Sequence, residues 1–576
     1  MHHLAVTTSS EVELPPEAPP KSRQAPIERA RSALAGLLGR RYVPPAVVAV
    51  GLVLLAVAYY LQARTVPTTS EGSSQALQAW SMLHGNTLLR GWSLSDVSFY
   101  TTEIPEYALV ELVRGLNTWT IPLAAAISYF LQVVLAAFLA KGRAAGREGW
   151  VRALIAVGIM LAPPLGAPTT LLMASPDHAG THVPLLLIYL VLDRVRTRWW
   201  LPVVITVMLT WAAIGDPLVI YEGALPIAGV CLMRIYRQRK QWSRQWHELS
   251  LAVGAAASVG AARVILKVIE DHGGFYVRTP IAAFGTPDQI SQAFWAKVGN
   301  VLLVFGADFL GAVFGRTAIM ALLHLIGLVL AFWAVAAVVR RFYVEDDQIV
   351  QMLAAAFMIV LVAYILGIKP DSNEIVGLLP LGAVLAGRVL GSKIINTGLI
   401  PVLGAVLVAL AVFLGANATW PSQVNPNRQV AIWLQQHHLR YGLAAYWNAS
   451  AVTVETGGNV KVRPVRTYQA KVVTTNFQTD STWYDPHKHY ANFVIWLPKE
   501  HCFDFCLSKV GLKSTFGRPA RVINVGTFKV LIYHKNLLTS VRELSWCGEI
   551  WPWRAYTTPA SDLHCAGISG AALVPK

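Results

Sequence analysis

The sequence contains little charge. Asp, Glu, Lys and Arg make up only 14% of its 576 residues, whereas soluble globular chains carry about 25%. This deficit excludes an ordinary cytosolic enzyme, and a disordered chain even more firmly. Apolar residues account for 54% of the chain, and the mean hydropathy is +0.47. They gather into runs of about 17 to 25 residues, the length that crosses a bilayer as a helix. The sequence therefore predicts a polytopic membrane protein.

Eleven membrane-spanning helices are predicted from these runs. They lie near residues 45–64, 119–140, 152–173, 183–193, 199–214, 217–235, 248–266, 317–339, 348–367, 375–391 and 398–416. The fourth run is short, so we expect its helix to begin earlier. Residues 1–44 contain Pro-rich sequence without apolar periodicity and are predicted to be a disordered tail.

Basic residues indicate the orientation of these helices. The net charge is +16, and Lys and Arg concentrate in the tail and in the even-numbered connections, as at 141–152, 194–198 and 234–244. Under the positive-inside rule the N-terminus is cytoplasmic and the C-terminus extracytoplasmic. The positive charge therefore reports the topology of a multi-pass protein in the plasma (inner) membrane, and we expect no nucleic-acid partner.

The predicted membrane module, residues 45–416, contains two unusual outer segments. The outer loop 65–118 has no long apolar run, but it has apolar side chains spaced to lie on a membrane surface: Trp80, Leu83, Leu88, Leu89 and Trp92. An interfacial helix is expected there. Residues 289–314 are similar but are interrupted by polar residues. They fit either an interfacial helix or a segment that re-enters the membrane.

The last part of the chain, 417–576, changes character and predicts an extracytoplasmic soluble domain. Helical spacing occupies 427–438, and alternating apolar residues predict strands in four stretches: 451–456, 460–465, 490–496 and 528–533. The fold class is thus an α-helical membrane protein with a C-terminal β-rich α/β domain. This domain also holds all but one of the five cysteines: Cys502, Cys506, Cys547 and Cys565.

These four cysteines predict two disulfides, because an even set in an oxidising compartment is typical of paired cysteines. Pairing Cys502 with Cys506 and Cys547 with Cys565 is one of three connectivities. A zinc site is the alternative, since three residues separate Cys502 from Cys506.

Carboxylates gather on the predicted outer face. Glu71 follows the first span, Glu103 lies later in the same loop, and Asp177 and His178 lie between spans three and four. A carboxylate there could act as a general base for sugar transfer; the alternative is that each acid is simply solvated. His178 and His182 would share a helical face and could form a metal corner, or be ordinary loop histidines.

Cations on the same face are candidates for binding a lipid phosphate. We favour Arg278, in a Gly-Gly-Phe-Tyr-Val-Arg stretch, and Lys369, beside a Pro-Asp pair. The alternative is a contact with lipid headgroups. The chain has no Walker loop, no dinucleotide-binding glycine pattern after a strand and no His-Glu-x-x-His motif.

This arrangement resembles the C-type (GT-C) membrane glycosyltransferases. Residues 45–576 resemble their architecture: many spans, a long first outer loop with an acid just after span one, and an outer C-terminal domain. Glu71 stands where these families usually have Asp, and Asp177 falls where a second acid is expected. Lys369 resembles the basic donor contact of a late loop, but as Lys instead of Arg. The chain lacks Asp-x-Asp and Glu-Glu-Asp, which leaves the exact family and any metal requirement open.

The resemblance implies a bacterial enzyme that takes sugar from a polyprenyl phosphate. The sugar would pass, with inversion, to an extracytoplasmic glycan, lipid or protein acceptor. Glu71 would act as general base, with Asp177, His178 and Glu103 nearby. A cation or a divalent metal, Mg²⁺ or Mn²⁺, would offset the phosphate charge. Two alternatives are a transporter or flippase of envelope substrates and a non-enzymatic assembly protein.

Overall fold

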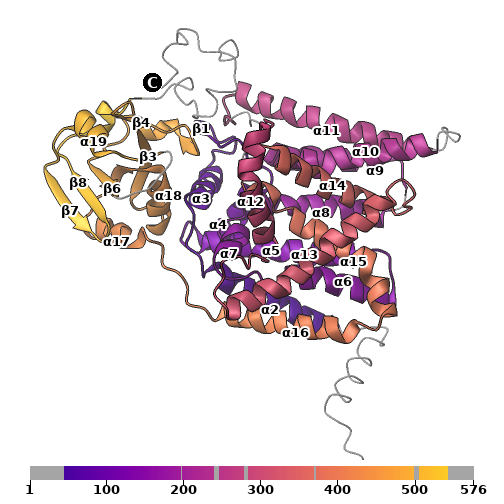
Figure 1. The fold of residues 1–576 in the computed structure, drawn as a ribbon. Helices are drawn as coiled ribbons and strands as arrows, with labels where there is room; N and C mark the ends of the chain where they lie inside the picture. Colours follow the sequence, from indigo (N-terminus) through magenta and orange to yellow (C-terminus); the bar gives the residue numbers. More distant parts are fainter. Residues whose placement is uncertain are drawn as a thin grey trace, which may run out of the picture.

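The fold is described from a computed structural model, which describes residues 45–195, 197–238, 245–277, 283–368, 371–498 and 505–542. The predicted tail, 1–44, lies outside these residues. Long helices run side by side and form a bundle, and a sheet region formed by the C-terminal part of the chain lies at one end of it (Figure 1).

A helix occurs in each of the eleven predicted runs. These helices are α2 Pro45–Ala63, α5 Thr120–Lys141, α6 Gly146–Met160, α8 Asp177–Arg194, α9 Leu201–Gly215, α10 Leu225–Arg237, α11 Trp246–Asp271, α13 Arg316–Arg340, α14 Gln348–Leu366, α15 Leu378–Asn396 and α16 Ile400–Ala418. Six of them are long and apolar enough to cross a membrane: α5, α11, α13, α14, α15 and α16. The chain is therefore a multi-pass membrane protein, while the count of eleven spans stays a prediction.

The third and fourth predicted runs differ from the observed helices for clear physical reasons. The third run, 152–173, is not one helix: α6 ends at Met160, and the short helix α7, Ala167–Met173, follows a break. Pro163 and Pro164 lie in this break, and proline cannot donate the backbone hydrogen bond that a continuing helix needs. Helix α8 begins at Asp177, earlier than its apolar run, as expected for a run too short to span.

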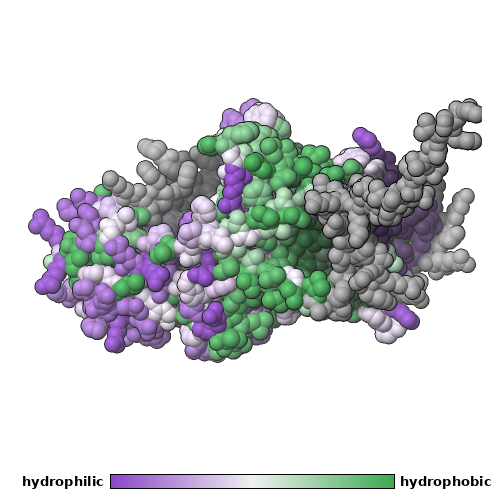
Figure 2. All heavy atoms as spheres, turned by 90° about the horizontal axis from the view of Figure 1, so that it is seen from below, coloured by the Kyte–Doolittle hydropathy of each residue, from purple (hydrophilic) through white to green (hydrophobic). Residues whose placement is uncertain are grey.

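The exposed surface of the bundle is apolar. Figure 2 shows hydrophobic side chains gathered over the bundle on one face of the molecule, with hydrophilic side chains over the sheet region. Large apolar side chains on this bundle include Val203, Val207 and Val264, which are 61–63% exposed. Soluble proteins rarely expose apolar patches of this extent. The bundle surface is therefore suited to contact lipid.

The outer loop packs against the sheet region, and this contact buries two of the side chains that were predicted to lie on a membrane surface. It forms α3 Ser70–Leu83, β1 Trp92–Ser93 and α4 Glu103–Arg114. The interfacial placement predicted for Leu89 and Trp92 is wrong, because they are 0% and 2% exposed and belong to an apolar cluster with Leu443 and Trp483. Strand β1 also pairs antiparallel with β5, Thr479–Asp480.

Residues 287–304 form α12, Pro287–Val304, which crosses the direction of the bundle helices (Figure 1). A capping box formed by Thr286 and Gln289 starts the helix. Among its described residues only Lys297 and Val304 are buried. An exposed helix lying across the bundle fits the interfacial alternative for this segment.

The sheet region contains one mixed six-stranded sheet in the order β4-β3-β2-β6-β8-β7. Its elements are α17 Arg428–Gln436, β2 Tyr441–Ala444, α18 Tyr446–Glu455, β3 Lys461–Tyr468, β4 Lys471–Thr474, β6 Phe493–Trp496, α19 Lys509–Phe516, β7 Arg521–Val525 and β8 Phe528–Ile532. Strand β2 pairs parallel with β3 and β6, and the other neighbours pair antiparallel.

Three of the four predicted strands are confirmed, as is the helix predicted at 427–438. The strand predicted at 451–456 is wrong, because this segment lies in α18. That helix is the crossover that parallel strands β2 and β3 require. Its residues from Asn448 to Val454 are all buried. The helix therefore has no solvent-exposed face, and the sequence lacks the charged residues at helical spacing that would mark it as a helix.

Candidate functional site

Glu71 lies in the first turn of α3, at the point where this helix touches the bundle. The Thr69 hydroxyl caps the helix by accepting a hydrogen bond from the Gly72 backbone N–H. A Cβ atom on Gly72 would lie 2.9 Å from the Ser175 Cβ and 3.0 Å from the Ile121 Cγ2. Glycine therefore permits the close approach that brings Glu71 to the start of α8.

Asp177 is held in place at the start of α8. Gln75 Nε2 donates to Asp177 Oδ1 at 2.9 Å, and Ser175 Oγ donates to Asp177 Oδ2 at 2.6 Å. Gln75 lies one helical turn after Glu71, so both side chains are on the same face of α3. The backbone of Asp177 has φ +32°, an uncommon conformation for a residue with a side chain. Helix α3 and the residues just before α8 thus fix this carboxylate near Glu71.

Burial and acidic neighbours raise the pKa of Glu71 to about 8. Burial is the largest cause, followed by the negative charges of Asp177 and Asp371. The Glu71 carboxyl group is therefore mostly protonated at neutral pH and ionises slightly above it. A cation bound beside these acids would favour the ionised form.

A second group of polar side chains lies next to the first. His178 Nδ1 lies 2.7 Å from Asp216 Oδ2, and Asp216 is fully buried. The Thr181 hydroxyl lies 3.0 Å from Asp216 Oδ2 and 2.9 Å from Glu103 Oε1. Asp177, His178 and Thr181 occupy the first turns of α8, so one helix connects the carboxylates of α3, α4 and the end of α9.

Glu103, like Asp216, is a fully buried acid of this group. It is 0% exposed, and it accepts hydrogen bonds from Thr102 and Thr181. Burial and the charge of Asp216 hold its pKa well above the usual range. Glu106, one turn later, accepts a hydrogen bond from Ser128, and burial raises its pKa to about 7. Glu103 is thus suited to hold a proton inside the network.

The metal corner considered for His178 and His182 does not form. The two histidines share a helix, but each faces its own carboxylate: His182 Nε2 lies 2.7 Å from Glu222 Oε2, whereas His178 faces Asp216. Within the described ranges no group of three His, Cys, Asp or Glu side chains could hold a metal ion. The His182–Glu222 pair is 1% exposed on both sides and lies against Gly377, where a Cβ atom would be 2.3 Å from each partner.

The two predicted phosphate-binding residues, Arg278 and Lys369, lie outside the described residues. The described end of the segment that carries Lys369 does reach the site, because Asp371 acts on the pKa of Glu71. Its other end is fixed by Lys297, whose Nζ donates to the backbone oxygens of Ile365 at 2.9 Å and Gly367 at 2.6 Å. The described residues on either side, Gly367 and Asp371, therefore have defined positions, and Asp371 is on the side of the carboxylates.

The predicted disulfides are not tested, because Cys502, Cys547 and Cys565 lie outside the described residues. Cys506 is described, but its predicted pairing stays a prediction. In the bundle Cys231 is buried and free.

Several members of the site carried no distinct sequence signal. Gln75 and Thr181 are ordinary helix residues until the fold places them between carboxylates. Glu222 did carry a signal, since an acid inside an apolar run is costly and by default functional. Glu222 was nevertheless not among the predicted site residues.

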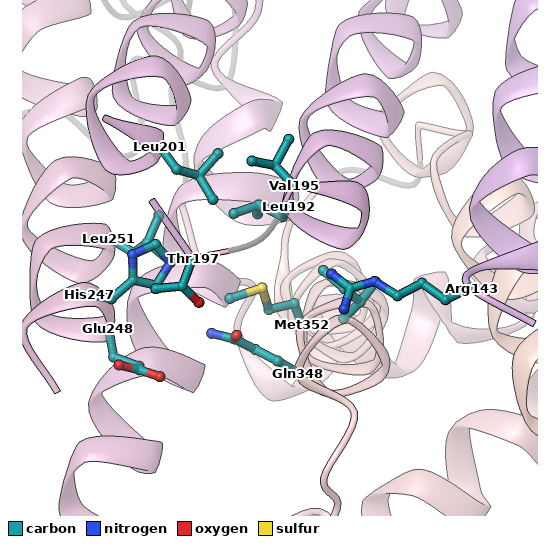
Figure 3. Close-up of a pocket in the computed structure, with 11 residues that line it drawn as sticks. Arg143, Leu192, Val195, Thr197, Leu201, His247, Glu248, Leu251, Gln348 and Met352 are labelled. Carbon is teal, nitrogen blue, oxygen red and sulfur yellow. The ribbon is translucent and has the colours of Figure 1, made fainter. Parts of the chain in front are cut away.

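A separate cavity of about 380 Å³ lies at the other end of α8 (Figure 3). Leu192 and Val195 line it from the end of α8, and Arg143, His247 and Glu248 point toward it from neighbouring segments. Asp177 lies at the opposite end of the same helix. This cavity is therefore distinct from the carboxylate site.

Comparison with solved structures identifies similar folds. ArnT from Cupriavidus metallidurans in the apo state has a TM-score of 0.52 and 11% identity, over 89% of this chain and 99% of that chain. The same protein bound to undecaprenyl phosphate has a TM-score of 0.50 and 12% identity, over 85% and 98%. The apo oligosaccharyltransferase of Archaeoglobus fulgidus has a TM-score of 0.40 and 10% identity, over 77% and 69%.

No protein-family model matches the chain, and no curated protein matches it. The likeness to ArnT confirms the predicted resemblance to the GT-C fold. At 11–12% identity it establishes the fold alone.

Proposed function

We propose that the chain is a membrane glycosyltransferase that moves a sugar from a polyprenyl-phosphate donor to an extracytoplasmic acceptor. The observation that carries this proposal is the pair of acidic neighbours Glu71 and Asp177, both half-buried where α3 meets the start of α8. The GT-C-like fold supports it, and so does the undecaprenyl phosphate bound in a structure of similar fold.

The proposed reaction is a single displacement with inversion. Glu71 takes the proton of an acceptor hydroxyl while the hydroxyl oxygen attacks the anomeric carbon of the sugar. The bond from that carbon to the phosphate oxygen breaks, and polyprenyl phosphate leaves with the electron pair. A base with a pKa of about 8 suits this step, because general bases work best when their pKa is near the operating pH. Asp177, fixed by Gln75 and Ser175, keeps the pKa of the base raised.

The leaving phosphate needs positive charge beside it. We propose Lys369 and Arg278 for this contact. Asp371, two residues after Lys369, acts on Glu71, which supports a position of this segment near the base. A divalent metal could also stabilise the charge on the departing phosphate. The described residues, however, include no group of three His, Cys, Asp or Glu side chains that could hold one, so we assign this role to the two cations.

The test is transfer of labelled sugar from a panel of polyprenyl-phosphate sugars by the purified protein. Glu71→Gln should lower kcat by 10²-fold or more, since general-base catalysis contributes roughly 10²–10⁴-fold. Glu270→Gln is the matched control, because Glu270 is part of a surface ion pair on α11. Equal loss in both variants, or no loss in Glu71→Gln, would remove Glu71 from this role.

A further inference from the structure

A groove of about 330 Å³ lies between α3 and the sheet region. Trp80, Ser81 and His84 border it from the end of α3, while Lys461 and Arg463 border it from β3. It belongs to neither the carboxylate site nor the cavity of Figure 3, which have different lining residues. The proposed reaction leaves this groove unexplained.

The aromatic side chains of the groove form a rigid wall. The rings of Trp92 and Trp483 pack edge to face with centroids 4.9 Å apart, and Trp92 Nε1 donates to Ser81 Oγ at 3.4 Å. Trp80 is only half-buried, and its ring lies 4.2 Å from that of His84. A rigid indole presents a large apolar face at low cost in conformational entropy, with polar groups at its edge. Such a wall suits a ligand that is apolar on one face and rich in hydroxyl groups.

The charge of the groove is positive. The Arg463 guanidinium stacks on the Trp483 ring at 3.8 Å and is fixed by a hydrogen bond from Nε to the Tyr441 hydroxyl. Lys461 is exposed on the same strand. Among the described residues that line the groove none is Asp or Glu. A planar guanidinium is suited to bind carboxylate or phosphate.

The groove and Glu71 lie on different faces of α3. Nine residues separate Glu71 from Trp80, which at 3.6 residues per turn places them on opposite sides of the helix and roughly 14 Å apart along its axis. The contacts agree, since Gln75 faces Asp177 whereas Ser81 faces Trp92. The part of a molecule that lies in the groove therefore cannot be the part that reacts at Glu71.

We propose that this groove binds an anionic saccharide, one that carries carboxylate or phosphate groups. Trp80 provides the stacking surface, and Lys461 with Arg463 binds the negative charge. If the saccharide is the acceptor, which rests on the function proposed above, the groove holds a distal part of an acceptor chain. It then sets KM for long anionic acceptors and leaves kcat unchanged.

The first test measures binding to the full-length protein in detergent by calorimetry. The probes are a tetra-uronate, its neutral methyl ester and a phosphorylated tetrasaccharide. We expect at least one charged probe to bind about tenfold more tightly than the ester, and the two charged probes distinguish carboxylate from phosphate. Lys461→Gln should remove most of this difference, whereas Lys535→Gln, at an exposed lysine outside the groove, should not. Equal affinity for ester and charged probes would overturn the proposal.

The aromatic contribution is tested separately. Trp80→Ala should weaken every probe about tenfold, and Trp80→Phe should restore part of the affinity because it keeps a ring. Trp199→Ala is the control, at a tryptophan that is 77% exposed and far along the chain from the groove. Because Lys461 is exposed, its variant stays informative even where Trp80→Ala fails to fold.

The second test separates this proposal from the proposed reaction. With a long charged acceptor, Lys461→Gln should raise KM without changing kcat, while Glu71→Gln should abolish transfer and keep binding to the groove. If the wild type binds charged probes selectively but transfers sugar to no acceptor, the proposed transferase function is contradicted and the proposed saccharide site is supported. If the wild type transfers sugar, groove variants do not affect transfer and no probe binds selectively, the saccharide site is contradicted and the transferase function is supported.

Discussion

Glu71 combines burial with acidic neighbours, and this combination sets the pH range in which its carboxyl group is ionised and can act as a base. Its position after the first span was enough to select it from the sequence, as was the position of Asp177. The partners that hold Asp177 were not predictable, because Gln75 and Ser175 become significant only through contacts between α3 and the segment before α8. A single sequence reports which residues can ionise, but their pKa depends on the neighbours that folding brings close.

The raised pKa of Glu71 predicts a pH dependence. Since the base acts in its ionised form, kcat/KM should rise about tenfold per pH unit below pH 8 and level off above it. Asp371→Asn removes a negative charge that raises this pKa, so the rising limb of the variant's pH–rate profile should move to lower pH. Asp288→Asn, at an exposed position on α12, should leave the profile unchanged. The measurement is a pH–rate profile of each variant, and coincident limbs for wild type and Asp371→Asn would contradict it.

The contact between α3 and the bundle is the element on which the site depends. Gly72, in the small-residue stretch Ser-Glu-Gly-Ser-Ser, makes the close approach. Other elements were harder to predict. Helix α18 was mistaken for a strand because it is buried on all sides, and the break after α6 was absorbed into a continuous apolar run. The periodicity of apolar residues identifies helices and strands that have one solvent-exposed face, and it fails for elements that are buried on all sides.

Gly72→Ala should move Glu71 away from Asp177. The new Cβ would lie 2.9 Å from the Ser175 Cβ, so helix and bundle must separate. We expect transfer to fall on the order of 10- to 100-fold, the cost of misplacing a catalytic group by about 1 Å. Stability should fall by about 1–3 kcal/mol, as in other overpacked sites.

Gly260→Ala is the matched control. Gly260 lies inside α11, where a Cβ atom would meet nothing within 4 Å. Alanine there should keep full activity and slightly raise the thermal midpoint, because it is the better helix former. Equal activity of Gly72→Ala and Gly260→Ala would show that the approach of α3 is not needed for transfer.

At the scale of the whole molecule, the predicted orientation in the membrane rests on the distribution of charge. The sheet region and the carboxylate site lie at one end of the bundle, and the Arg-rich connections were predicted at the other. Hydrophobicity and the distribution of Lys and Arg were enough to predict a multi-pass protein with an added C-terminal fold. They could not show that this fold packs on the first outer loop, because that contact joins distant parts of the chain.

Orientation can be measured with single cysteines. Lys535→Cys, in the sheet region, should react with a membrane-impermeant maleimide in intact cells. Arg147→Cys, at an exposed position in the first turn of α6, should react only after permeabilisation. The unsubstituted chain gives the background from its own cysteines. The reverse pattern would invert the topology and place the carboxylate site on the cytoplasmic face.

The pairing of β1 with β5 also orders events during synthesis. Trp92 belongs to a strand made early, and its partner Asp480 is made near the end of the chain. Until the ribosome has passed this point, Leu89 and Trp92 lack the residues that bury them. A prematurely terminated chain therefore presents bare apolar surface beside its first outer helix, which makes it distinguishable from a finished one by any protease that degrades exposed hydrophobic segments.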